Sequence, residues 1–329
     1  MFSFPQRVLT LLQFTRMALV FTAISNGWAA MLLQQHATRE PIPFWYAVAM
    51  TMVSVGLYTF GMSLNDLIDR RRDSQIAPGR PLPSGRISVR TAHLICFALA
   101  LFALGGGAWM AILKHGQWIS LLLVAWTMLL IVFYDFAGKY LVPLGLISLG
   151  LIRFFHAATA APNLAIPWHA LLLLVHVTVL STICYRLEGK RPRLKWKHWI
   201  PVMGGLLLII ATLIALLIER RLNGVDWRQA LFVSDALLYV AASVVVFVVL
   251  AIVIHVRTND PRTAGRSMML YGLLWLIVYD ASFVLGYVGW RWALVILSLL
   301  PISMLAVQVI RAWAKLLDLS AKPQYQRAR

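Results

Sequence analysis

Ten apolar runs, each long enough to cross a bilayer, dominate this sequence. A helix of about 20 apolar residues spans the hydrocarbon core and satisfies its own backbone hydrogen bonds there. The pattern therefore predicts an all-α polytopic membrane protein, built as a bundle of nine to ten transmembrane helices. The expected spans are about 8–33, 43–69, 89–113, 117–136, 141–162, 167–186, 198–219, 229–256, 264–285 and 291–316.

Composition supports one membrane domain over residues 1–329, because no linker or soluble segment interrupts the series of spans. Of the 329 residues, 60% are hydrophobic, and the mean hydropathy is +0.77. Cys96 and Cys184 lie far apart in apolar runs, which indicates no disulfide framework. We interpret the first apolar run, which Arg16 interrupts, as a retained span rather than a cleaved signal peptide.

The net charge of +18 comes from basic residues in short connections between the spans, chiefly 65–90, 186–198 and 257–266. With ten spans these connections fall on one side, which the positive-inside rule assigns to the cytoplasm. We expect a multi-pass protein of a bacterial-type inner (plasma) membrane with its active site facing the cytoplasm. We therefore expect the basic residues to contact anionic lipid of the bilayer or a diphosphate, and not nucleic acid.

An acidic motif ends the second apolar run. Asn65, Asp69 and Asp73 fall at i, i+4 and i+8, so they share one face if the helix continues, and Asp66 lies beside them. Carboxylates on successive turns repel one another unless a cation compensates them. Oxygen-only ligands favour Mg²⁺, which also binds phosphate oxygens.

This motif, followed by the basic loop from Arg80 to Arg86 (Arg-Pro-Leu-Pro-Ser-Gly-Arg), resembles the UbiA superfamily of intramembrane prenyltransferases. The resemblance implies a bundle around a central cavity open to the cytoplasmic side. It also implies that Mg²⁺ and the diphosphate of a prenyl donor bind at the motif. The implied metal ligands are Asn65, Asp66, Asp69 and Asp73. Asn65, Asp69 and Asp73 would be catalytic, and Asp66 and Arg80 would bind substrate.

A second stretch, Tyr134 to Lys139, looks like the family's Tyr-Ser…Lys segment after the fourth span, with Asp135 in place of a small polar residue. The resemblance implies two catalytic roles: Tyr134 helps to place the reacting carbon, and Lys139 contacts the diphosphate. An interfacial tyrosine and a snorkelling lysine would give the same pattern without a function.

The connection after the sixth span departs from the family pattern, commonly Asp-x-Glu-Gly-Asp-Arg. The frame around Glu188 is kept, but Arg186 and Lys190 stand where the two aspartates would. These cations, with Arg191, could grip the diphosphate directly and leave a single metal. Alternatively, the site no longer catalyses the reaction of a prenyl diphosphate donor.

Four polar residues within spans are further candidates for substrate binding, because an unpaired charge in hydrocarbon is costly. Arg153 and His156 lie near the middle of the fifth span, one turn apart, where Arg153 could hold an acidic or quinone-like acceptor. A structural pair of Arg153 with Asp280 or Asp235 is the alternative. Arg16 and Asn26, in the first span, are weaker candidates.

The function implied is Mg²⁺-dependent transfer of a prenyl group from an allylic prenyl diphosphate to a hydrophobic acceptor, a small aromatic or a lipid, within the membrane. No covalent enzyme nucleophile is needed. The alternative is a non-catalytic membrane carrier or scaffold that binds isoprenoid or anionic lipid. An ion-coupled transporter would need midplane carboxylates, whereas the motif carboxylates here gather at one surface.

Overall fold

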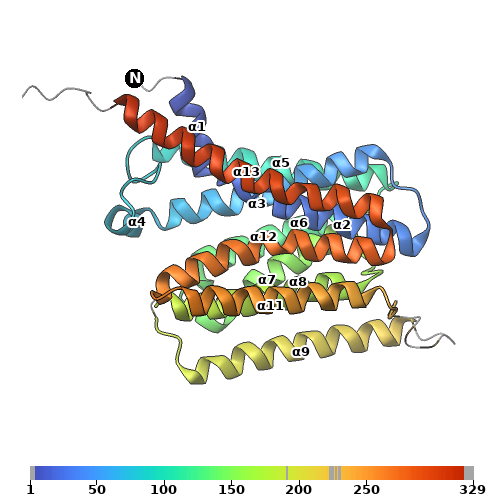
Figure 1. Ribbon diagram of the computed structural model, residues 1–329. Coiled ribbons are helices and arrows are strands. Elements are labelled where there is room, and N and C mark those ends of the chain that lie inside the picture. The colour runs from blue at the N-terminus through green and yellow to red at the C-terminus, as the bar shows by residue number, and fades with distance from the viewer. Residues whose placement is uncertain (1–3, 190–191, 222–225, 227, 229–230, 322–329) are drawn as a thin grey trace, which may run out of the picture.

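The computed structural model describes residues 4–189, 192–221, 226, 228 and 231–321, and every regular element within them is helical (Figure 1). Ten of the described helices are long and apolar enough to cross a membrane, which confirms the predicted all-α bundle. The elements are α1 (Phe4–Phe14), η1 (Met17–Leu19), α2 (Phe21–Thr38), α3 (Phe44–Ile68), α4 (Arg70–Ile76), α5 (Val89–Leu113), α6 (Ile119–Phe133), η2 (Tyr134–Gly138), α7 (Val142–Ala160), α8 (Pro167–Leu187), α9 (Trp196–Arg221), α11 (Leu237–Arg257), α12 (Pro261–Tyr287) and α13 (Trp290–Ala321).

The predicted first span, 8–33, is wrong at both ends. The helix α1 ends at Phe14, and Arg16 then adopts a left-handed backbone with φ 49° and ψ 40°. A left-handed residue other than glycine breaks a right-handed helix, at a cost of roughly 1–2 kcal/mol. The membrane-spanning helix therefore runs from Met17 to Thr38, and Arg16 lies at the corner before it. The predicted span 229–256 also begins too early, since α11 starts at Leu237.

The long helices lie side by side and run between two ends of the bundle (Figure 1). We call the end that carries α4 the acidic end, and the other the far end. The connections from α8 to α9 and from α11 to α12 also lie at the acidic end. The prediction that the basic connections share one side is therefore confirmed.

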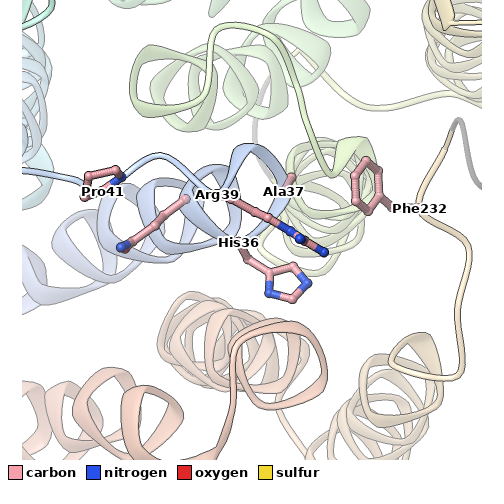
Figure 2. A pocket seen from close by; sticks show the side chains of 6 residues that line it. His36, Ala37, Arg39, Pro41 and Phe232 are labelled. Atoms are coloured by element: carbon pink, nitrogen blue, oxygen red, sulfur yellow. The ribbon is translucent and has the colours of Figure 1, made fainter.

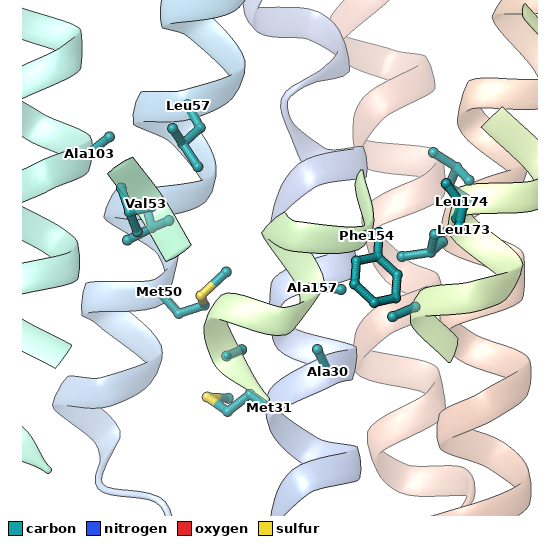
Figure 3. Packing of buried hydrophobic residues seen from close by; sticks show 14 of the residues in the cluster. Ala30, Met31, Met50, Val53, Leu57, Ala103, Phe154, Ala157, Leu173 and Leu174 are labelled. Carbon is teal, nitrogen blue, oxygen red and sulfur yellow. The ribbon is translucent and has the colours of Figure 1, made fainter. Parts of the chain in front are cut away.

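Small residues let α3 and α5 approach closely. A Cβ on Gly56 would lie 2.8 Å from the Cβ of Ala103, and one on Gly106 would lie 2.9 Å from the carbonyl oxygen of Ala49. Because lipid is as apolar as the side chains, the hydrophobic effect does not drive helices together within a membrane. Close van der Waals packing at small residues does so instead. Figure 3 shows Val53 on α3 facing Ala103 in the main core cluster. This packing holds α3, whose last turn carries the acidic motif.

Candidate functional site

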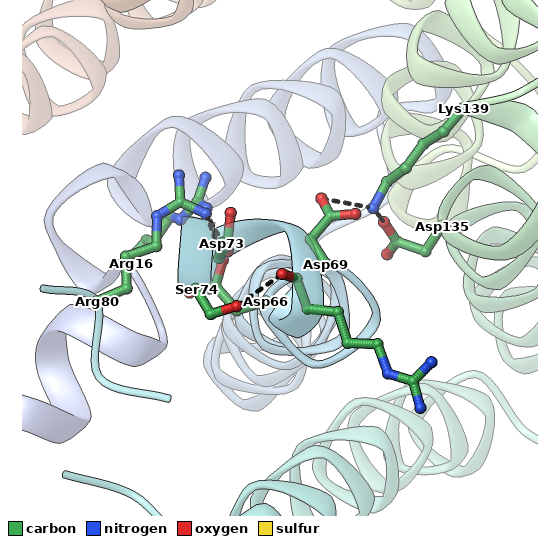
Figure 4. A network of polar contacts seen from close by, with 9 residues as sticks. Arg16, Asp66, Asp69, Asp73, Ser74, Arg80, Asp135 and Lys139 are labelled. Carbon is green, nitrogen blue, oxygen red and sulfur yellow. Dashed lines mark hydrogen bonds and ion pairs between the residues drawn. The ribbon is translucent and has the colours of Figure 1, made fainter. Parts of the chain in front are cut away.

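The acidic motif crosses a one-residue break between α3 and α4 without losing its helical hydrogen bonds. The N–H of Asp69 donates to the carbonyl of Asn65 (2.9 Å), and the N–H of Asp73 donates to that of Asp69 (2.8 Å). Asp66 and Asp73 are separated by seven residues, close to two turns, so they point nearly the same way. The motif thus presents two sets of carboxylates, Asp66 with Asp73, and Asp69 to one side (Figure 4).

Two arginines hold Asp66 and Asp73. Arg16 Nη2 lies 2.7 Å from Asp66 Oδ1, and Arg80 Nη1 lies 3.6 Å from the same oxygen. Arg80 Nη1 also lies 2.5 Å from Asp73 Oδ2. Asp66 and Asp73 are only 3% and 2% exposed, so their charges depend on these partners. The left-handed turn at Arg16 is what brings its side chain to this end of α3.

The loop after α4 folds back over the motif, and this fold brings Arg80 to the carboxylates. Leu82 and Ile87 are buried against Phe14 of α1. Arg86 donates from Nη1 to Gln13 Oε1 (2.9 Å) and from Nη2 to the carbonyl of Gly79 (2.6 Å). The loop is thereby tied to α1 by both apolar and polar contacts.

Lys139 joins the motif to the turn after α6. Its Nζ lies 3.0 Å from Asp69 Oδ2 and 3.0 Å from Asp135 Oδ1. Asp135 is 1% exposed and lies in the π-helical turn η2, a type of distortion often found at functional sites. Tyr134 begins that turn, and the Lys139 ammonium is 5.9 Å from the centre of its ring. The predicted pair Tyr134 and Lys139 therefore lies beside the acidic motif.

A close backbone contact shapes the corner that carries Lys139. A Cβ on Gly145, in the first turn of α7, would lie 2.1 Å from the carbonyl oxygen of Gly138. Only glycine fits at such a distance. The position of Lys139 therefore depends on the absence of a side chain at Gly145.

We call Asp66, Asp69, Asp73 and Asp135 with Arg16, Arg80 and Lys139 the acidic cluster. Its four carboxylates face three cations, which leaves one net negative charge. The oxygen donors suit Mg²⁺, and Asn65 lies partly buried in the last turn of α3. Among the described residues, however, no three acidic, histidine or cysteine side chains converge as a metal site. The donor set fits the metal, but its carboxylates are paired with cations that would have to move.

The predicted second motif lies only partly within the described residues. Arg186 is exposed in the last turn of α8, and the side chain of Glu188 lies against the start of α12, beside Gly265. Lys190 and Arg191 lie outside the described residues. The contact of these cations with a diphosphate stays a prediction.

A second polar group lies deeper in the bundle. Arg153 on α7 donates from Nη1 to Asn26 Oδ1 (2.9 Å) and from Nη2 to Thr22 Oγ1 (3.1 Å). Asn26 Nδ2 in turn donates to Asp280 Oδ2 (2.6 Å), and Asp280 Oδ1 lies 2.7 Å from His169 Nε2. We call these five residues, with Ser25, the midspan network. Asn26 thus lies between Arg153 and Asp280, and the suggested direct pair of Arg153 with Asp280 or Asp235 is wrong.

His156 faces α3 instead of joining the midspan network. Its Nε2 lies 3.0 Å from Ser54 Oγ, which itself donates to the carbonyl of Met50. Ser54 can therefore accept a hydrogen bond from His156 while it donates its own. The contact ties α7 to α3 inside the bundle, so the structure places His156 in helix packing.

The larger described hollow does not lie at the acidic cluster. It has a volume of about 650 Å³ and lies at the far end, between the end of α2 and Phe232 (Figure 2). A second space of about 10 Å³, next to His169, has room for roughly one water. The predicted central cavity stays a prediction.

Asp135, Asp280 and His169 were not among the predicted site residues but take part in these contacts. Asp135 is four residues before Lys139, a spacing visible in the sequence that indicates an ion pair. Asp280 and His169 are ionisable residues within apolar runs, which is itself a signal of a functional or paired group. The tertiary partners of all three required the fold.

The sequence is similar to those of known proteins. The sequence matches the UbiA prenyltransferase family over residues 18–185. Over 61 residues it is 41% identical to digeranylgeranylglyceryl phosphate synthase of Methanopyrus kandleri, a match that spans 18% of this chain and 22% of that relative.

Two solved structures share the fold. One, of digeranylgeranylglyceryl phosphate synthase in membranes, has a TM-score of 0.57 at 16% identity and covers 86% of this chain and 99% of its own. The other is an apo UbiA homologue from Aeropyrum pernix K1, with a TM-score of 0.51 and 18% identity. That match covers 82% of this chain and 96% of the homologue. With this fold and ten apolar helices among the described residues, the chain is a multi-pass integral membrane protein.

Proposed function

Because this chain belongs to the UbiA prenyltransferase family, we propose that it transfers a prenyl group from an allylic prenyl diphosphate to a small aromatic or lipid acceptor, with Mg²⁺ as cofactor. The observation that carries the proposal is the acidic cluster. It brings four carboxylates and three cations from separate parts of the chain to one end of the bundle.

The cations of the cluster suit the leaving group. Arg16, Arg80 and Lys139 now pair with carboxylates, and each can instead donate to diphosphate oxygens. Bound Mg²⁺, held by Asp66, Asp69, Asp73 and Asn65, would stabilise the charge that develops on the departing diphosphate. Released from their carboxylates, the cations of the cluster become available to the diphosphate.

The apolar helices suit the rest of the donor. Beyond the cluster, α3 and α7 are lined by hydrophobic side chains of the main core cluster. Such apolar surroundings would suit an isoprenoid chain and would keep water from a developing allylic cation. Tyr134, beside Lys139, would face the reacting carbon. Arg186, Glu188, Lys190 and Arg191 would close over the diphosphate from the α8 side.

We place the acidic end at the cytoplasmic face of a bacterial-type inner membrane. The basic connections gather at this end, and positively charged connections are retained in the cytoplasm. A water-soluble diphosphate would then reach the cluster from the cytoplasm while its chain enters the bilayer.

The test is release of diphosphate from allylic prenyl diphosphates by the purified protein, with and without Mg²⁺ and with a panel of acceptors. Asp69→Ala should abolish release, because it removes a proposed metal ligand. Arg291→Gln, which changes an exposed arginine at the far end, is the matched control and should behave as wild type.

The carrier alternative gives a different result in the same experiment. A carrier would bind the donor tightly and release no diphosphate under any condition, with or without Mg²⁺. That outcome would overturn the proposed transfer.

A further inference from the structure

The hollow at the far end is lined by basic and uncharged side chains. Its described lining consists of Gln35, His36, Ala37, Arg39, Pro41 and Phe232, and it encloses about 650 Å³, a volume typical of small-ligand sites. Figure 2 shows the guanidinium of Arg39 next to the ring of His36 and extended toward Phe232. A hollow with an arginine and a histidine, and with no carboxylate in its described lining, favours an anion.

No protein carboxylate neutralises Arg39. Among the described residues, no ion pair or side-chain hydrogen bond includes its guanidinium. The neighbouring Glu40 pairs instead with Lys114, whose Nζ lies 3.2 Å from Oε2 of Glu40. Residues 222–225, 227, 229 and 230, which precede Phe232 and lie outside the described part, include no acidic residue. The counter-ion of Arg39 therefore has to come from outside the chain.

The backbone at Arg39 is strained in a way that directs its side chain. Arg39 ends α2 in the left-handed conformation, with φ 58° and ψ 14°, a position that usually selects glycine. The helix dipole favours a basic residue at this end, but that gain is smaller than the cost of the left-handed turn. At the opposite end of the bundle, the left-handed Arg16 delivers its guanidinium to Asp66. The turn at Arg39 delivers its guanidinium to a hollow instead.

The opposite wall of the hollow is held in place by hydrogen bonds. Phe232 is also left-handed, with φ 53°, and its carbonyl accepts from Tyr287 Oη on α12 (2.6 Å). The carbonyl of Leu231 accepts from Trp168 Nε1 (2.8 Å). The ring of Tyr287 also packs edge-on against His36, with 6.2 Å between the ring centres. Both walls are thus fixed to α12, and strained residues held in this way cluster at ligand sites.

The hollow lies at the depth of the lipid headgroups. The membrane-spanning helix ends at Thr38, one residue before Arg39. Exposed tryptophans mark the starts of three helices at this end, Trp45 in α3, Trp118 before α6 and Trp290 in α13. Tryptophan is enriched where hydrocarbon meets water. The anions present at that depth are the phosphates of lipids, which bind basic pockets between membrane-spanning helices.

We infer that the hollow binds a phosphate group, supplied by the headgroup of an anionic phospholipid in the leaflet at the far end. The planar guanidinium of Arg39 pairs with two phosphate oxygens, and Gln35 and His36 offer further N–H donors. Because Arg39 follows α2 and Phe232 precedes α11, a bound headgroup links the two segments. The site lies at the opposite end of the bundle from the acidic cluster, and its occupancy needs no prenyl donor.

The test measures retention of phospholipid by the purified protein in native mass spectrometry. Micelles contain either anionic phosphatidylglycerol or zwitterionic phosphatidylcholine with the same acyl chains. Wild type is compared with Arg39→Gln, Arg39→Lys, Ala37→Glu and the control Arg291→Gln. The control removes an exposed positive charge at the same end, so it accounts for unspecific attraction to a chain with a net charge of +18. A parallel titration with inorganic phosphate, followed by the thermal midpoint, distinguishes a lipid from a free anion.

Wild type and Arg291→Gln should bind one phosphatidylglycerol about tenfold more tightly than phosphatidylcholine. Arg39→Gln should erase that preference, and Arg39→Lys should keep part of it, because the charge remains but the fork is lost. Ala37→Glu should match Arg39→Gln without removing a cation, because it adds a carboxylate to the lining. In phosphatidylcholine the Arg39 variants should keep the thermal midpoint of wild type, since Arg39 has no described side-chain partner to lose.

Equal retention of phosphatidylglycerol by wild type and Arg39→Gln would overturn the inference, as would a loss of the same size in Arg291→Gln. A lower midpoint of Arg39→Gln in phosphatidylcholine would also overturn it, because Arg39 would then support the fold itself. Inorganic phosphate that raises the midpoint of wild type but not of Arg39→Gln, without a preference for phosphatidylglycerol, would support the phosphate site and overturn the lipid as its source.

Discussion

Arg80 reaches back along its own loop to place Nη1 2.5 Å from Oδ2 of Asp73, a carboxylate that is only 2% exposed. The same nitrogen lies 3.6 Å from Asp66. A protein cation thus lies between two of the proposed metal ligands. If Mg²⁺ and a diphosphate bind as proposed, Arg80 would have to move from the carboxylates to the phosphate.

Arg80→Gln should change the affinities for metal and donor in opposite directions. Without the competing charge, Mg²⁺ should bind about tenfold more tightly in the absence of donor, as measured by calorimetric titration. The KM for the prenyl diphosphate should rise at least about tenfold, because a charge-assisted hydrogen bond to it is lost. Arg90→Gln, an exposed arginine in the same region, is the control. An unchanged Mg²⁺ affinity in Arg80→Gln would contradict the proposed metal ligands.

Lys139→Met should cost both stability and activity, and the two effects can be separated. The variant leaves Asp69 and the buried Asp135 without their shared cation, which should lower the free energy of unfolding by about 3 kcal/mol. The double variant Lys139→Met/Asp135→Leu removes one stranded carboxylate and should recover most of that loss in a detergent-titration unfolding experiment. Neither variant should release diphosphate. Activity that returns with stability would argue against a role for Lys139 at the diphosphate.

Gly145→Ala should displace the corner that carries Lys139. The new Cβ would lie 2.1 Å from the carbonyl oxygen of Gly138, so the backbone of η2 must shift. We expect a fall in both thermal midpoint and turnover. Gly105→Ala is the matched control, because nothing lies within 4 Å of its Cβ and alanine favours the helix by up to about 1 kcal/mol. Equal behaviour of the two variants would show that the contact does not matter.

Asp280→Ala should destabilise the bundle more than Asp280→Asn. Alanine leaves the buried Nδ2 of Asn26 without its acceptor, at a cost of about 1–3 kcal/mol. Ser25 Oγ also loses its bond to Asp280 and keeps only the longer one to the carbonyl of Thr22 (3.2 Å). Asparagine keeps one acceptor oxygen and should lose less. Thermal unfolding in detergent compares the two, and an equal loss would mean that the carboxylate charge, and not its hydrogen bonds, holds the network.

The sequence predicts most of the fold, because hydropathy alone marks the long spans. The span 89–113 coincides with α5, and 43–69 differs from α3 by one residue at each end. The break in the helix at Arg16 was not predicted, because no glycine or proline in the sequence marks the left-handed residue there. The pairing of Arg16 with Asp66 that accompanies the break is a tertiary contact, which the sequence does not show.

The site was predictable where its residues are close in the sequence. The aspartates of the motif are local, and their spacing alone suggests a cation site. Their division into two sets was not predictable, because Arg80 and Lys139 reach them only through the folded loop and the η2 corner. Likewise, the link from Arg153 through Asn26 to Asp280 joins three separate helices, so only the fold reveals it.

The measurement that tests the central claim most directly follows the prenyl group itself. Purified protein is incubated with a prenyl diphosphate radiolabelled in its allylic carbon, Mg²⁺ and a lipid extract of its host membranes. We predict a labelled, Mg²⁺-dependent product that contains no diphosphate and is absent with Asp69→Ala. Label that stays entirely in the diphosphate, although the donor binds to the protein, would contradict the account and favour a carrier.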